Sequence, residues 1–125
     1  MTMKVLIIDD EEDNRQIANL ALTMIGGFTV IEADGGELGL KLAEAEKPDV
    51  ILLDFVMPNM NGLETLKALR RNPLTEKIPV IFVSTKSLQE REKELFEAGA
   101  QGILPKPFNP TQLPEKIKEI TGLGA

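Results

Sequence analysis

Short apolar runs alternate along the chain with longer segments in which apolar residues recur every three or four positions. The short runs are rich in β-branched residues and contain almost no polar position, which is typical of strands buried on both faces of a parallel sheet. Five runs have this character: 4–8, 28–33, 49–53, 80–83 and 102–104. The pattern therefore predicts five strands.

The segments between these runs have the spacing of helices that bury one face. Five helices are predicted. The fourth is a charged stretch at about 88–98, and the apolar positions of the other four are Ile17, Leu20, Ala21 and Met24; Leu38, Leu42 and Ala45; Leu63, Leu66 and Leu69; and Leu113, Ile117 and Ile120. Gly26 and Gly27 end the first helix and Gly99 ends the fourth, since glycine readily adopts the backbone conformation that follows a helix.

Strict alternation of strand and helix predicts an α/β fold, because each connection between parallel strands must cross over in the right-handed sense. We expect a five-stranded parallel sheet with five helices on both faces, in three layers. The chain has 125 residues and no repeat or linker, so we expect a single domain, 1–125. In such sheets ligands bind beyond the carboxyl ends of the strands.

Composition narrows the chemistry. The chain contains no cysteine and no histidine, which excludes disulfides, thiolate or imidazole metal ligands and imidazole catalysis. A net charge of -6 argues against direct nucleic-acid binding. No apolar run approaches the length of a membrane span, so we expect no membrane insertion. The N-terminus turns acidic after one short apolar run, unlike a secretory signal, and we expect a cytoplasmic location.

Polar residues stand where four of the five predicted strands end. Asp9 and Asp10 follow the first strand, Asp54 the third, Ser84 the fourth and Lys106 the fifth. Three carboxylates and one ammonium group would leave a local charge of about -2, which a divalent cation would neutralise. Mg²⁺ fits best, because it binds a few carboxylates and keeps several waters.

Asp54 is placed to act as a nucleophile. An ionised carboxylate has no proton to lose before it attacks phosphorus, so an acyl phosphate could form without a histidine base. The metal, Lys106 and the Ser84 hydroxyl would each bind one oxygen of the transferred group.

These residues resemble the receiver domain of response regulators over essentially the whole chain. The resemblance rests on the acidic pair Asp9 and Asp10, segment 52–62 with Asp54, segment 79–85 and segment 106–108. It implies a flavodoxin-like sheet with strand order 2-1-3-4-5.

The resemblance also implies roles for single residues. Asp54 would be the phosphoacceptor, Lys106 would contact the phosphoryl group and Ser84 would be the switch hydroxyl. Asp10, Asp54 and the backbone carbonyl of Val56 would bind Mg²⁺ directly, and Asp9 would act largely through coordinated water. A cis bond is expected before Pro107.

For partners, the resemblance implies a single-domain, chemotaxis-type receiver in a two-component system or phosphorelay. A histidine kinase or histidine phosphotransfer protein would donate the phosphoryl group, and a downstream protein would bind the switched surface. No output module is encoded within the 125 residues, so the signal would pass by protein contact through the last two helices and the fifth strand. We expect a monomer or a weak, phosphorylation-dependent dimer. The chain would promote its own phosphorylation and slow dephosphorylation without being a turnover enzyme.

Two positions depart from the family pattern, and a third, Val56, is a variable position that in the family flanks the route of attacking water. Ile103 stands where receivers commonly have Tyr or Phe, which puts an aromatic switch in doubt. Thr85 stands where alanine or glycine is more frequent. Val56 has no polar atom to orient an attacking water, so we expect slow loss of the phosphoryl group.

Each residue also has an ordinary explanation. Asp9 and Asp10 could cap the next helix, although residues 11–13 are better placed for that, Asp54 could start a turn, and Lys106 could be a solvated surface lysine. Two other functions stay open: a receiver-like docking module that is not phosphorylated, which Ile103 would suit, and a Mg²⁺-dependent phosphohydrolase. The phosphohydrolase is least favoured because Val56 stands where such enzymes carry a second acid.

Overall fold

The computed structural model describes residues 2–84, 91–106 and 108–123. These residues form a five-stranded parallel sheet in the order β2-β1-β3-β4-β5, which confirms the expected order. The strands are β1 (Lys4–Ile8), β2 (Thr29–Ala33), β3 (Val50–Asp54), β4 (Val80–Ser84) and β5 (Gly102–Pro105). Thr85, Pro107 and the beginning of the helix expected at 88–98 lie outside the described residues.

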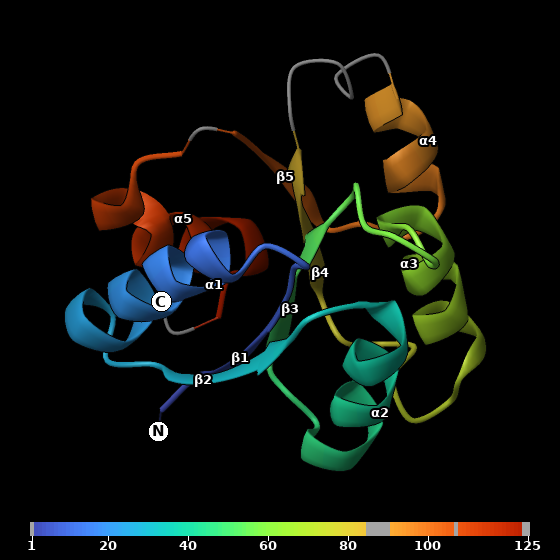
Figure 1. Ribbon diagram of the computed structural model, residues 1–125, viewed down its shortest axis with the longest axis horizontal. Helices are drawn as coiled ribbons and strands as arrows, with labels where there is room; N and C mark the ends of the chain where they lie inside the picture. Colours follow the sequence, from blue (N-terminus) through green and yellow to red (C-terminus); the bar gives the residue numbers. More distant parts are fainter. Residues whose placement is uncertain (1, 85–90, 107, 124–125) are drawn as a thin grey trace.

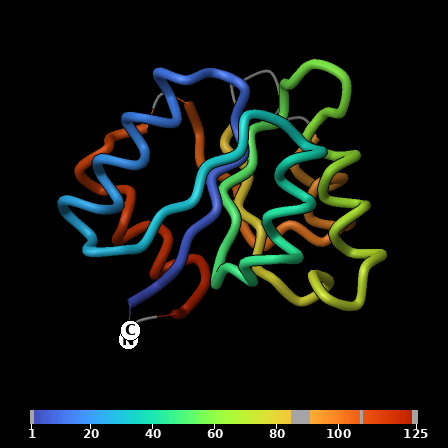
Figure 2. The backbone as a smooth tube through the Cα atoms, turned by 60° about the horizontal axis from the view of Figure 1, so that its bottom comes forward, coloured from blue at the N-terminus to red at the C-terminus, as the bar shows by residue number. Residues whose placement is uncertain are grey.

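Helices cover both faces of the sheet, as expected (Figure 1). One face carries α1 (Glu12–Leu20), its π-helical continuation η1 (Ala21–Ile25), the 3₁₀ turn η3 (Pro110–Gln112) and α5 (Leu113–Thr121). The other face carries α2 (Gly36–Glu46), α3 (Gly62–Arg71) and α4 (Glu92–Glu97). Figure 2 shows the same division, with α1 and α5 on one side of the strands and α2 and α3 on the other.

The central strands divide their side chains between two apolar cores. One core, against α2, α3 and α4, receives Leu6, Ile8, Ile51, Leu53, Val80 and Phe82. The other, against α1 and α5, receives Val5, Ile7, Val50, Leu52, Ile81 and Val83. Because successive side chains point to opposite faces, both faces of β1, β3 and β4 are buried. Polar groups therefore collect at the ends of the strands, where these cores stop.

Apolar spacing locates α1 but not its buried side. Ile17, Leu20 and Met24 are 46%, 61% and 80% exposed, whereas Ala21 and Leu22 are buried. The small alanine lets the helix approach the sheet closely, and the π-helical turn adds a residue that rotates the later side chains relative to an α-helix. Within the described ranges, no helix is long and apolar enough to cross a membrane.

Candidate functional site

Lys106 and the acidic residues predicted from the sequence converge at the carboxyl edge of the sheet. Asp54 is the last residue of β3, Asp9 follows β1 and Lys106 follows β5. The Lys106 ammonium nitrogen lies 2.9 Å from Oδ1 of Asp54 and 3.9 Å from Oδ2 of Asp9. The side chain of Lys106 is only 19% exposed, so it is not the solvated surface lysine of the ordinary explanation.

Three carboxylates share this edge. One oxygen from each of Asp9, Asp10 and Asp54 lies within 4.8 Å of the other two. Asp9 and Asp54 are buried, whereas Asp10 is exposed, so the cluster is closed on one side and open to solvent on the other. This set of oxygen donors fits Mg²⁺, which binds few carboxylates and keeps several waters.

The charge of Asp9 is costly in this position. Burial raises the pKa of its carboxyl to about 6 from the ordinary 3.8, the backbone N–H of Glu11 opposes the rise, and the negative charge of Asp54 adds to it. Lys106 lowers the pKa of Asp9 by a smaller amount. A bound cation would relieve the repulsion between the acids.

Asp9 also takes part in starting α1. Its Oδ1 accepts a hydrogen bond from the Glu11 N–H at 2.9 Å, while Glu11, at the N-cap, makes no side-chain capping bond. Glu12 and Asp13 lie in the first turn of α1, where acids meet the helix dipole, and Glu11 stands at the N-cap without a side-chain bond. The same carboxylate that faces Asp54 holds the turn after β1.

The loop after Asp54 is held by its own backbone and by a cap on α3. The Gly62 N–H donates to the Phe55 carbonyl at 2.8 Å, which folds the loop back against β3. Asn61 and Glu64 form a reciprocal capping box, with Asn61 accepting from the Glu64 N–H at 2.9 Å. Because these contacts fix both ends of the loop, the position of Asp54 is tied to the start of α3. This cap was not predicted, although the Asn-x-x-Glu spacing signals it.

Val56 lies within this loop and is 66% exposed. Ser84 is buried at the end of β4, one residue beyond Val83, which pairs with Asp54 in the sheet register. The backbone carbonyl of Ser84 accepts a hydrogen bond from the Lys106 N–H at 2.6 Å, which ties the end of β4 to Lys106.

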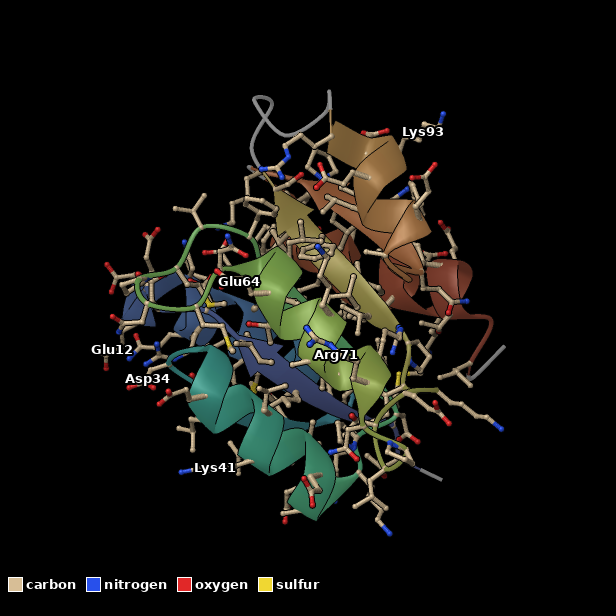
Figure 3. All side chains as sticks on the ribbon, turned by 90° about the vertical axis from the view of Figure 1, so that its right-hand side faces the viewer. Glu12, Asp34, Lys41, Glu64, Arg71 and Lys93 are labelled. Atoms are coloured by element: carbon tan, nitrogen blue, oxygen red, sulfur yellow. The ribbon has the colours of Figure 1, made fainter. Side chains whose placement is uncertain are left out.

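An aromatic pair adjoins the site on the α2–α4 face. Phe55 follows Asp54 and packs against Phe82, with ring centroids 6.1 Å apart, and the guanidinium carbon of Arg91 lies 5.0 Å from the centroid of Phe55. Ile103 is half-buried against the same core. The contact of Arg91 was not predicted, because no spacing in the sequence relates it to Phe55. Figure 3 views this face, where Arg71 and Lys93 mark α3 and α4.

A flavodoxin-like sheet with three acids and a lysine at its carboxyl edge defines a class of phosphoryl-accepting signalling domains. The chain matches the response regulator receiver domain family over residues 5–118, and it belongs to this family. It is therefore a receiver domain of two-component signalling.

Individual relatives agree with this assignment. The chemotaxis protein CheY homolog of Campylobacter jejuni is 36% identical over 124 residues, which cover 98% of this chain and 95% of that protein. The phosphate regulon transcriptional regulatory protein PhoB of Pseudomonas aeruginosa is 34% identical over 116 residues, and the chain spans only 50% of its length. Among solved structures, the chemotaxis protein CheY4 of Vibrio cholerae superimposes with a TM-score of 0.89 at 33% identity, covering 96% of this chain and 99% of CheY4.

Proposed function

We propose that Asp54 accepts a phosphoryl group in a Mg²⁺-dependent reaction and that the resulting charge switches a protein-binding surface. The observation that carries this proposal is the 2.9 Å contact between Lys106 and Asp54 beside two further carboxylates. An acid held between an ammonium group and a candidate metal site is oriented for attack on phosphorus.

In the transfer, a carboxylate oxygen of Asp54 forms a bond to phosphorus while the bond between phosphorus and the donor breaks. The electron pair of that bond leaves with the donor, as acetate when the donor is acetyl phosphate or as neutral imidazole, after protonation, when it is phosphohistidine. Asp54 needs no base, since it attacks as the anion.

The metal would be held by Asp10, Asp54 and the backbone carbonyl of Val56, with Asp9 acting through coordinated water. Bound there, Mg²⁺ would offset the negative charge that gathers on the phosphoryl oxygens. The ammonium group of Lys106 would bind a second phosphoryl oxygen. It would exchange its contact with the Asp54 carboxylate for this one.

Ser84 supplies the conformational response in this proposal. Its hydroxyl would bind a phosphoryl oxygen, and with Lys106 it would favour a second packing of the β4 and β5 ends over the first. Ile103 has no polar tip, so this repacking would involve an aliphatic side chain in place of the usual aromatic switch.

The phosphoryl donor would be a histidine kinase or a histidine phosphotransfer protein. A downstream protein would then bind the surface formed by α4, β5 and α5. The chain would work in the cytoplasm as one domain over 1–125, as a monomer or a weak phosphorylation-dependent dimer. It would catalyse only its own modification and slow dephosphorylation, without turnover of a substrate.

Incubation with acetyl phosphate and Mg²⁺ followed by intact-mass measurement tests the proposal. The wild type should gain one phosphoryl group, and Asp54→Asn should gain none. Asp34→Asn is the matched control, because Asp34 is an exposed acid after the neighbouring strand β2 and should not alter uptake. Equal uptake by Asp54→Asn would defeat the assignment, and no uptake by the wild type would favour the docking module.

A further inference from the structure

Glu32 has no part in the proposed chemistry, yet it stands inside the layer between β2 and α1. Its carboxylate accepts from Nε of Arg15 at 3.1 Å and from Nδ2 of Asn19 at 2.7 Å. The side chain of Glu32 is 33% exposed and that of Arg15 is 16% exposed. An acid partly withdrawn from water on a strand, with both oxygens paired, indicates a specific structural purpose.

The other end of Arg15 reaches the candidate metal site. Its Nη1 donates to the backbone carbonyl of Asp9 at 2.7 Å, a short bond of the charge-assisted kind. Asn19 thus holds Glu32, Glu32 holds Arg15, and Arg15 holds the backbone of Asp9. Arginine suits this place because its planar fork can serve a carboxylate and a carbonyl together, which the single nitrogen of lysine cannot do in the same geometry.

The carbonyl that Arg15 binds belongs to the peptide unit joining Asp9 to Asp10. The preceding peptide unit is also fixed, since the Asp9 N–H donates to the Ala33 carbonyl of β2 at 3.1 Å. With both peptide planes fixed, the backbone at Asp9 has little freedom, and the position of the Asp10 Cα is set with it.

We propose that Arg15, held by Glu32, is a positioning residue that orients Asp9 and Asp10 and thereby sets their affinity for Mg²⁺. The inference rests on the proposed function, since it takes the acidic cluster as the metal site. The expected effect of removing Arg15 is opposite in sign to that of simple electrostatics. A cation near a metal site repels the metal, so loss of the Arg15 charge alone would tighten Mg²⁺ binding. Loss of the orientation that Arg15 gives the acids would weaken Mg²⁺ binding.

The test is an NMR titration with MgCl₂ that gives the dissociation constant, together with thermal unfolding in the absence of metal. Arg15→Met should weaken Mg²⁺ binding about tenfold, within the range for outer contacts of metal ligands. Arg15→Lys keeps the charge but not the bridge, and should weaken binding at least about threefold.

Arg70→Met is the matched control. Arg70 is also a partly buried arginine that donates to backbone carbonyls, those of Glu76, Ile78 and Gly99, but at the opposite end of the strands. Its substitution should lower the melting temperature without moving the dissociation constant for Mg²⁺. A merely structural contribution of Arg15 would give this same result.

Glu32→Gln completes a double-mutant cycle. It should weaken Mg²⁺ binding in the wild type and have no further effect in Arg15→Met, because the two residues act as one unit. A dissociation constant within twofold of wild type, or a tighter one, in both Arg15 variants would overturn the inference while leaving the proposed function intact. Absence of Mg²⁺ binding by the wild type would overturn both.

Discussion

The ammonium nitrogen of Lys106 lies 2.9 Å from Oδ1 of Asp54, although 52 positions separate the two residues in the chain. This contact replaces water that the carboxylate loses at the edge of the core. A partly buried ion pair of this kind contributes modestly to net stability, but removing one partner leaves the other uncompensated. In the proposed function, the pair orients Asp54 for attack on phosphorus.

Lys106→Met should slow phosphorylation by acetyl phosphate about 100-fold, because a positioned donor to the developing negative charge is lost. Intact mass followed over time in saturating Mg²⁺ measures the rate. Lys116→Met is the control, since Lys116 is half exposed on α5 and pairs there with Glu119. An unchanged rate in Lys106→Met would show that the ion pair has no part in transfer.

Asp9 makes stability depend on pH in the metal-free protein. Its folded pKa is about 6 and its ordinary value 3.8. Between these two pH values the folded protein keeps a proton on Asp9 that the unfolded chain has released. The free energy of unfolding therefore falls as pH rises from the lower value to the higher one, and the fall is complete above the folded pKa.

Asp9→Asn stays neutral and should escape that loss. With EDTA present, we expect the variant to match the wild type near pH 4 and to exceed its free energy of unfolding by about 1–3 kcal/mol near pH 7. Urea unfolding across this range measures the difference, and Asp34→Asn again serves as control. A gap that does not grow with pH would contradict the assigned pKa.

Much of this architecture could be predicted from the sequence, since burial on both faces makes β1, β3 and β4 nearly pure apolar runs. The convergence of Asp9, Asp54 and Lys106 followed because parallel strands end at one edge. Arg15 and Arg91 could not be found in this way. The contacts that matter here, of Arg15 with the Asp9 carbonyl and of Arg91 with the Phe55 ring, leave no periodic signal in the sequence.

Gly62 also illustrates what a sequence pattern omits. A methyl group there would stand 2.5 Å from the backbone oxygen of Asp54 and 2.8 Å from Cα of Phe55. Glycine is therefore required by close approach of α3 to β3, in addition to any turn it makes.

Gly62→Ala should lower the free energy of unfolding by about 1–3 kcal/mol, because backbone atoms would have to shift. It should also slow phosphorylation, since the shifted atoms include the backbone of Asp54. Gly35→Ala is the control: the added methyl group meets nothing within 4 Å, and the expected cost is below about 1 kcal/mol. Equal effects of the two substitutions would show that the contact with Asp54 is unimportant.

Val56 should determine how long the phosphoryl group persists. Its side chain is 66% exposed in the loop that follows Asp54, and it has no atom that could accept a proton from a water or orient one. Hydrolysis of the acyl phosphate needs such a water in line with phosphorus, so the wild type should lose its phosphoryl group slowly.

Val56→Asn introduces an amide that can orient the water, and we expect it to shorten the lifetime of the phosphorylated protein about tenfold, at the low end of general acid–base effects. Val56→Leu keeps the site apolar and should leave the lifetime unchanged. The lifetime is measured by intact mass after acetyl phosphate is removed by rapid desalting. Decay of the wild type within seconds, or equal lifetimes in all three proteins, would mean that water reaches the phosphoryl group by a route on which this side chain has no influence. The asparagine should act on hydrolysis alone, because the proposed metal ligand at this position is the backbone carbonyl, which the substitution retains.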